Sequence, residues 1–81
     1  NELENKITLY PNPTTGIINL QTQQKVNSVS VYNLMGQKVS FHPLNKENTS
    51  IDISNLSSGI YFVEVILNNN KKIKTYKVIK N

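Results

Sequence analysis

The chain lacks cysteine, tryptophan, alanine and arginine, and these absences exclude several classes of structure. Without Cys there is neither a disulfide framework nor a thiolate metal site. Without Ala, and with few other strong helix formers, a helical bundle is not expected. No apolar run approaches the roughly 20 residues of a membrane-spanning helix, and the N-terminus lacks the pattern of a signal peptide. The 81 residues are therefore expected to form one small soluble domain.

The residues that are present favour β-structure. Ile, Val and Thr recur in short alternating runs, separated by turn residues at intervals of about ten. The runs predicted as strands are 7–10, 17–22, 28–32, 39–41, 51–53, 60–67 and 71–80. We therefore predict an all-β fold, an immunoglobulin-like antiparallel β-sandwich of about seven strands over residues 7–81. The polar residues 1–6 are predicted to form a linker, and 45–50 a loop.

The predicted turns depend on residues with special backbone preferences. They are Pro11, Asn12, Pro13, Gly16, Asn33, Gly36 and Gly59. The two prolines cannot lie in a central strand, so they end the first strand. Asn33 suits the first position of a type I turn, because its side chain can accept from a backbone N–H two residues on. Gly36 and Gly59 are expected to supply backbone angles that other residues avoid.

The strongest predicted strand is 60–67. Alternation places Tyr61, Val63 and Val65 on one face, and these are predicted core residues. Glu64 shares the other face with apolar neighbours, so that face is expected to be only partly covered.

Candidate catalytic and metal-binding residues are few. The one His, His42, precedes Pro43 at a predicted strand end, and Asp52 lies between two Ile. Nothing in the sequence places a Ser beside either residue, and no GxSxG motif is present. We interpret His42 as a surface loop residue and 68–70 (Asn-Asn-Asn) as a turn. No enzyme activity, metal or cofactor is predicted.

The net charge of +4 raises the possibility of nucleic-acid binding. Five of the nine Lys residues lie in the last eleven positions. Arg, which makes the bidentate contacts to bases and phosphates, is absent, and Tyr76 is the one aromatic residue among these lysines. A solvated edge strand protected from aggregation by lysines explains this pattern equally well. No nucleic-acid partner is predicted.

Four motifs in order carry a resemblance to a known family. They are Tyr10-Pro11-Asn12-Pro13 with Gly16, Val31-Tyr32-Asn33-Leu34-Met35-Gly36-Gln37-Lys38-Val39, Ile51-Asp52-Ile53-Ser54-Asn55-Leu56-Ser57-Ser58-Gly59-Ile60-Tyr61-Phe62-Val63, and Lys74-Thr75-Tyr76-Lys77-Val78-Ile79-Lys80. Together they resemble the C-terminal sorting domain of the type IX secretion system of Bacteroidetes-type bacteria.

The resemblance implies a non-catalytic sorting signal, covalently linked to a cargo domain on its N-terminal side. The cargo would enter the periplasm with its own signal peptide. An outer-membrane translocon would then recognise the folded sorting domain, and a sortase would commonly remove it. The cut would fall in residues 1–6. The cargo would finally reach the cell surface or the medium.

Candidate contacts with the translocon lie in the last strand. They are Lys74, Lys77, Val78 and Lys80, of which the three lysines are expected to be exposed. Leu34 and Met35 form a second candidate patch, although packing against a neighbouring loop is the favoured interpretation. The chain is expected to be a monomer or a weak dimer paired through an edge strand.

Two alternative functions remain open from the residues. One is an accessory carbohydrate-binding module of a secreted multidomain protein, which would usually present a planar row of exposed Trp or Tyr. The other is a spacer or oligomerisation module that pairs through an exposed sheet edge.

Overall fold

The computed structural model describes residues 7–67 and 73–81, which form seven β-strands. The strands are β1 (Ile7–Tyr10), β2 (Ile17–Thr22), β3 (Val26–Tyr32), β4 (Lys38–Lys46), β5 (Thr49–Asp52), β6 (Gly59–Leu67) and β7 (Ile73–Lys80). The predicted all-β fold is confirmed. Within the described ranges, no helix is long and apolar enough to cross a membrane. The predicted linker at 1–6, the turn at 68–70, and Lys71 and Lys72 lie outside the described residues.

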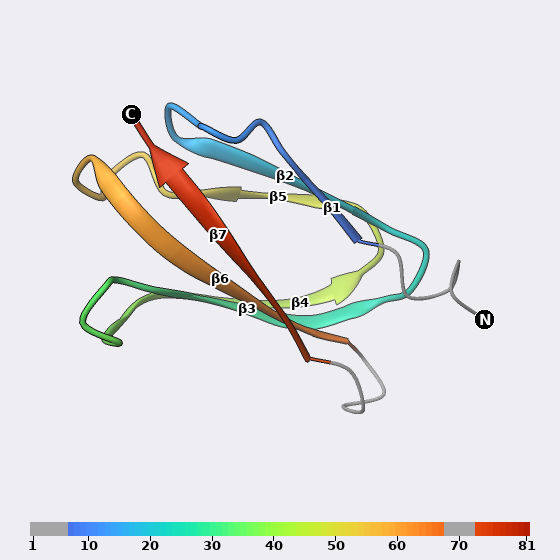
Figure 1. Cartoon of the computed structure of the whole chain (residues 1–81). Helices are drawn as coiled ribbons and strands as arrows, with labels where there is room; N and C mark the ends of the chain where they lie inside the picture. The colour runs from blue at the N-terminus through green and yellow to red at the C-terminus, as the bar shows by residue number, and fades with distance from the viewer. Residues whose placement is uncertain (1–6, 68–72) are drawn as a thin grey trace.

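The strands form two antiparallel sheets that face each other as a sandwich (Figure 1). The three-stranded sheet has the order β1-β2-β5, and the four-stranded sheet has the order β4-β3-β6-β7. Every strand pair is antiparallel. β4 and β7 are therefore the edge strands of the larger sheet.

The core lies between the sheets and is built by alternation along each strand. On β6 the residues Tyr61, Val63, Val65 and Leu67 are buried, whereas their neighbours are half-buried, as the sequence predicted. Other strands contribute the remaining buried side chains: Ile18, Leu20, Val26, Val29, Val31, Ile51, Ile53 and Val78. Burying one such side chain stabilises a fold by about 1.5–3 kcal/mol. With no Cys in the sequence, this core and the strand pairing stabilise the domain.

Strand β4 differs from its prediction. It does not end at His42 and Pro43 but continues to Lys46, so the predicted loop at 45–50 shrinks to residues 47 and 48 between two strands. Pro43 is tolerated because β4 is an edge strand, where a missing N–H need not break the ladder. The β3–β4 register shifts between Val31 and Tyr32, which is the mark of a β-bulge.

The predicted turn chemistry is confirmed at the β3–β4 hairpin. The Asn33 side-chain oxygen accepts from the Met35 N–H at 2.9 Å and from the Gln37 N–H at 3.0 Å. The Gly36 N–H donates to the Asn33 carbonyl at 3.0 Å. Gly36 has a φ of 82° and Gly59 a φ of 156°, angles that L-residues rarely adopt.

The outer faces of the two sheets differ in chemistry. The three-stranded sheet turns mainly polar side chains to solvent: Thr8, Tyr10, Ile17, Asn19, Gln21, Ser50 and Asp52. The four-stranded sheet turns outward many apolar ones: Tyr32, Phe41, Ile60, Phe62, Ile66, Ile73 and Ile79, together with Lys38, Glu64 and Lys77. Ser28 and Ser30 share this face yet are only 6% and 2% exposed, because larger neighbours cover them.

Candidate recognition surface

The turn after β1 is bonded to the second half of β7. The Asn12 side-chain amide donates to the Lys77 carbonyl at 2.9 Å, and its oxygen accepts from the Ile79 N–H at 3.0 Å. Thr14 continues the contact: its N–H donates to the Ile79 carbonyl, and its carbonyl accepts from the Asn81 N–H, both at 2.8 Å. Thr14 and Lys80 thus form a parallel bridge. Figure 1 shows the C-terminus beside this turn.

Within this turn, Thr14 and Gly16 fix the geometry. The Thr14 hydroxyl donates to the Ile17 carbonyl at 2.7 Å and accepts from the Gly16 N–H at 3.1 Å. A Cβ added at Gly16 would lie 2.9 Å from the Cβ of Ser54, so the turn packs closely against the chain that follows β5. The predicted turn at Pro11, Asn12 and Pro13 is confirmed, and both X–Pro peptide bonds in it are cis.

The four predicted contact residues of β7 do not form one surface. Lys77 points to the outer face of the sheet, because it is paired with Phe62, whereas Lys74 and Lys80 are paired with residues of the opposite parity, Val65 and Gly59. Lys74 and Lys77 are exposed. The predicted exposure of Lys80 is wrong, because Lys80 is only 8% exposed.

Val78 is also buried, at 1% exposure, and belongs to the core. In the folded domain Lys74 and Lys77 are therefore the accessible members of the predicted set. The roles of all four residues in recognition stay predictions.

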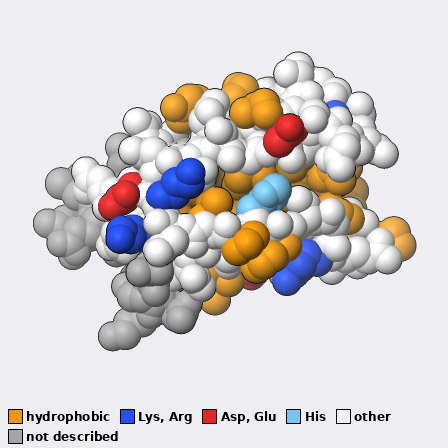
Figure 2. Space-filling view, turned by 180° about the vertical axis from the view of Figure 1, so that it is seen from behind, with side chains coloured by type: hydrophobic (Ala, Val, Ile, Leu, Met, Phe, Trp, Pro, Cys, Tyr) orange, Lys and Arg blue, Asp and Glu red, His pale blue; other side chains and the backbone are white. Residues whose placement is uncertain are grey.

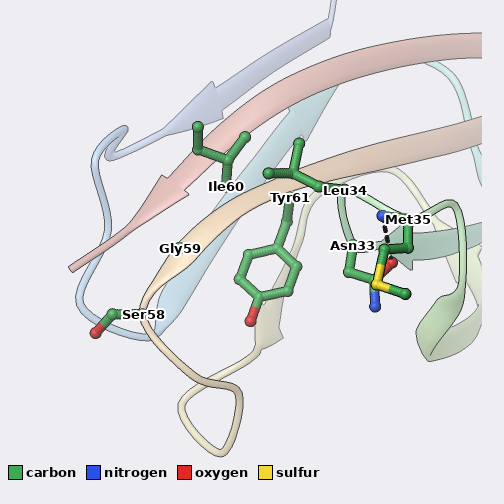
Figure 3. A pocket seen from close by; sticks show the side chains of 7 residues that line it. All are labelled: Asn33, Leu34, Met35, Ser58, Gly59, Ile60 and Tyr61. Carbon is green, nitrogen blue, oxygen red and sulfur yellow. Dashed lines mark hydrogen bonds between the residues drawn. The ribbon is translucent and has the colours of Figure 1, made fainter.

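The β3–β4 hairpin tip presents the most exposed apolar side chains on the described chain. Leu34 is 66% exposed and Met35 81%, so the favoured interpretation, packing against a neighbouring loop, is wrong. Instead, the tip faces the first residues of β6 and the residue before them across an open hollow of about 240 Å³ (Figure 3). Ser58, Gly59, Ile60 and Tyr61 line its other side. The Tyr61 hydroxyl donates to the Ser57 carbonyl at 2.7 Å, which ties the β5–β6 turn to the core strand.

The outer face of the four-stranded sheet combines aromatic and basic groups. The Lys38 Nζ lies 5.1 Å from the ring centre of Phe41 and 5.9 Å from that of Tyr32, within the range of cation–π attraction. The Tyr32 hydroxyl donates to Glu64 Oε1 at 3.3 Å. Figure 2, which views the molecule from behind, shows hydrophobic and lysine side chains next to one another.

His42 lies within strand β4, so its interpretation as a loop residue is wrong. Its Nε2 is 2.6 Å from the Ser40 Oγ, because residues two apart on a strand share a face. Burial lowers the pKa of His42, and the charge of Asp52 opposes this shift. Asp52 has a lowered pKa because hydrogen bonds from Ser54 stabilise its charged form, and its Oδ1 accepts from the Ser54 N–H at 2.9 Å.

The arrangement around His42 has limited chemical capacity. Ser40 lies beside His42 and Ser54 beside Asp52, so the expectation that no Ser lies beside either residue is wrong. The Ser40–His42 contact satisfies two half-buried polar groups. Across the residues with described positions, no group of three or more His, Cys, Asp or Glu could hold a metal ion.

These features define a class: a β-sandwich whose distinctive parts are a fastened C-terminal strand and an apolar outer face. A family model described as "Secretion system C-terminal sorting domain" matches residues 8–81. Because this match covers nearly the whole chain, the chain belongs to that family, and the suspected resemblance is confirmed. It is a type IX sorting signal of a larger secreted protein that reaches the cell surface or the extracellular space. The domain itself is non-catalytic.

One similar curated protein is described as "Ulvan lyase NLR42" from Nonlabens ulvanivorans, with 29% identity over 75 residues. The match covers 90% of this chain but only 14% of that protein. The similarity therefore concerns a small part of the lyase.

Sequence reasoning missed the long-range role of Asn12 and Thr14. Their partners on β7 are about as far away in sequence as the chain allows, and the local pattern indicated only a turn. The separation of Lys77 from Lys74 and Lys80 could have been found, since an odd spacing along a strand puts residues on opposite faces.

Proposed function

We propose that residues 7–81 form the folded signal by which an outer-membrane type IX translocon recognises its cargo. The cargo is a domain covalently linked on the N-terminal side, in transit through the periplasm. The observation that supports this proposal best is that the family match extends over residues 8–81 and not only over the last strand.

The fold supports the proposal that recognition requires the whole domain. The second half of β7 is fastened by Asn12 and Thr14, which come from the opposite end of the chain. It is also anchored by Val78 in the core. The C-terminal strand is thus presented in one conformation only when the sandwich has formed.

We further propose that the translocon contacts the exposed Lys77 and Lys74 of β7. Leu34 and Met35 at the hairpin tip form a second apolar contact. A sortase then removes the domain by cutting within residues 1–6. Leu34 and Met35 are adjacent and both exposed, and a contiguous exposed apolar patch is typical of a contact site, which supports the second contact.

The first alternative function, that of a carbohydrate-binding module, is less favoured. Such a module presents free aromatic faces, whereas Lys38 lies over the rings of both Tyr32 and Phe41 on the apolar sheet face. The alternative as a spacer does not account for the family membership.

The experiment fuses the chain to a reporter that enters the periplasm of a type IX-secreting bacterium. Deletion of residues 71–81 is expected to trap the reporter in the periplasm. Because this deletion also removes core residues, Lys77→Glu is the sharper variant, and Lys46→Glu on β4 is its matched control. We expect Lys77→Glu to reduce secretion and Lys46→Glu to leave it unchanged. Normal secretion of the deleted form would disprove the proposed function.

A further inference from the structure

Along β7, every second residue directs its backbone N–H and C=O away from β6, to the outer edge of the strand. In an antiparallel ladder a residue directs both its N–H and its C=O to the same side, and the next residue directs them to the other side. The bonds made by Ile79 and by the Lys77 carbonyl to Asn12 and Thr14 run away from β6. The β6–β7 register continues without a shift from Ile66↔Ile73 to Gly59↔Lys80. The N–H and C=O of Ile73 and Thr75, and the N–H of Lys77, therefore also point to the outer edge.

The two halves of this edge differ in whether their outward backbone groups are hydrogen-bonded. From the Lys77 carbonyl to the Asn81 N–H, every outward group is bonded to Asn12 or Thr14. In the first half, no hydrogen bond between residues of described position reaches the outward groups of Ile73 or Thr75. Figure 1 shows this first half at the lower end of the molecule, away from the three-stranded sheet.

The side chains of the open half define the chemistry of a partner. Ile73 is 57% exposed on the outer face, and Lys74 and Lys77 are exposed on opposite faces. A strand added here would place one side chain opposite each of these residues. Carboxylates opposite Lys74 and Lys77 and an apolar residue opposite Ile73 would match all three.

A second copy of the chain fits this edge less well than an acidic segment does. Pairing two β7 strands through their open halves would bring Lys74 and Lys77 of one copy near the same lysines of the other. Like charges on adjacent strands destabilise pairing. Lysines on an edge strand are a known protection against such self-association.

We propose that the open half of β7, Ile73–Lys77, is a docking edge for an extended acidic segment of a partner protein, which adds as a fifth strand to the four-stranded sheet. The added strand extends the edge that Asn12 and Thr14 already occupy, and its apolar residue extends the apolar outer face at Ile73. This inference deepens the proposed function and rests on it for the partner's place in secretion.

The binding test uses the 81-residue domain and a synthetic peptide with the core Glu-Thr-Val-Glu-Ile. In an antiparallel arrangement this order places Glu opposite Lys77 and Lys74, and Ile opposite Ile73. Binding is followed by NMR at low salt. We expect the amide signals of Thr75 and Lys77 to shift and those of β4 to stay unchanged. A peptide with both Glu replaced by Lys is expected to bind at least about tenfold more weakly.

The domain variant that tests the backbone edge is Thr75→Pro. It removes an N–H that points outward, so the β6–β7 ladder stays intact, and proline is tolerated on such an edge. The matched control Thr75→Val keeps the N–H and the β-branched shape. We expect Thr75→Pro to weaken peptide binding by about tenfold and Thr75→Val to leave it unchanged. A circular dichroism spectrum and a urea midpoint check that both variants fold.

The outcomes distinguish the inference from the proposed function. Equal peptide binding by folded Thr75→Pro and Thr75→Val, or equal binding of the acidic and basic peptides, would overturn the docking edge. Sedimentation that shows a dimer lost in Thr75→Pro would assign the edge to a second copy and also overturn it. Where the unchanged domain exports the reporter and Thr75→Pro exports it equally well, the docking edge fails and the sorting function stands. Where the unchanged domain exports nothing, the sorting function itself fails, while the peptide measurement still decides the edge.

Discussion

The two edge strands of the four-stranded sheet, β4 and β7, are protected from aggregation in different ways. An edge strand presents unpaired backbone groups and must avoid aggregation. β4 carries Pro43, which has no N–H, and a register shift near Val39 that disturbs the ladder. β7 has a regular register along its length, and its second half is covered by Asn12 and Thr14.

The difference indicates that β7, and not β4, is the edge at which another strand can pair. On β4 the features that hinder pairing with another strand, Pro43 and the register shift, belong to the strand itself. On β7 the cover comes from Asn12 and Thr14 and ends at Lys77. Among the residues with described positions, the first half is protected by its lysines alone. A regular, partly open edge at the end of a sorting domain is a suitable place for a partner strand.

The largest expected difference between the two edges is in core anchoring. Val78 on β7 is 1% exposed, whereas Val39 on β4 is 37% exposed. We expect Val78→Ala to lower the free energy of unfolding by about 2 kcal/mol, because it removes buried methyl groups and leaves a cavity. Val39→Ala should cost less than about 0.5 kcal/mol. Urea denaturation measures both, and equal losses would contradict the asymmetry.

A smaller effect is expected from the cover of β7. Asn12→Ala removes two hydrogen bonds to exposed backbone and should cost about 1 kcal/mol. Hydrogen exchange should accelerate at the Ile79 amide, which donates to Asn12, more than at amides of β3. Asn45→Ala, at an exposed position of β4, is the matched control. Unchanged protection at Ile79 would mean that Asn12 does not hold the strand.

The smallest expected effect is the pH response of β4 through His42. Burial lowers the pKa of His42 below its ordinary value of 6.5, so the unfolded chain binds the proton more readily than the folded domain does. The contribution of neutral His42 to the stability of the folded domain is thus complete above the pKa of the unfolded chain. It is lost as the pH falls below 6.5 toward the pKa of the folded domain. The urea concentration at the unfolding midpoint should therefore decrease as the pH is lowered from about 7.5 to about 5. His42→Gln should flatten this response, and a midpoint that rises on acidification would contradict the burial of His42.

The sequence was sufficient to predict most of the fold. Alternation identified the buried face of β6, and the preferences of Asn33 and Gly36 identified the hairpin turn. β4 was predicted too short because Pro43 usually ends a strand, and nothing local shows that a strand will lie at an edge.

The candidate surface was predicted less well. The family motifs directed attention to β7, whose role in recognition stays a prediction. The predicted exposure of Lys80 is wrong, because Lys80 is paired with Gly59 and turns toward the inner face beside the Thr14 bridge. The bonds of Asn12 to Lys77 and Ile79 join opposite ends of the chain and follow from the tertiary fold alone. Local patterns carry no signal for such contacts.

A gain-of-function fusion tests whether the domain by itself directs export. The 81-residue chain is fused to the C-terminus of a periplasmic reporter that is not normally exported, in a bacterium with an active type IX system, and the reporter is measured in the medium and on the cell surface. We expect export that depends on the translocon and is lost in a strain without it. A reporter that stays in the periplasm, although the fused domain is folded, would mean that the domain is not sufficient as a sorting signal.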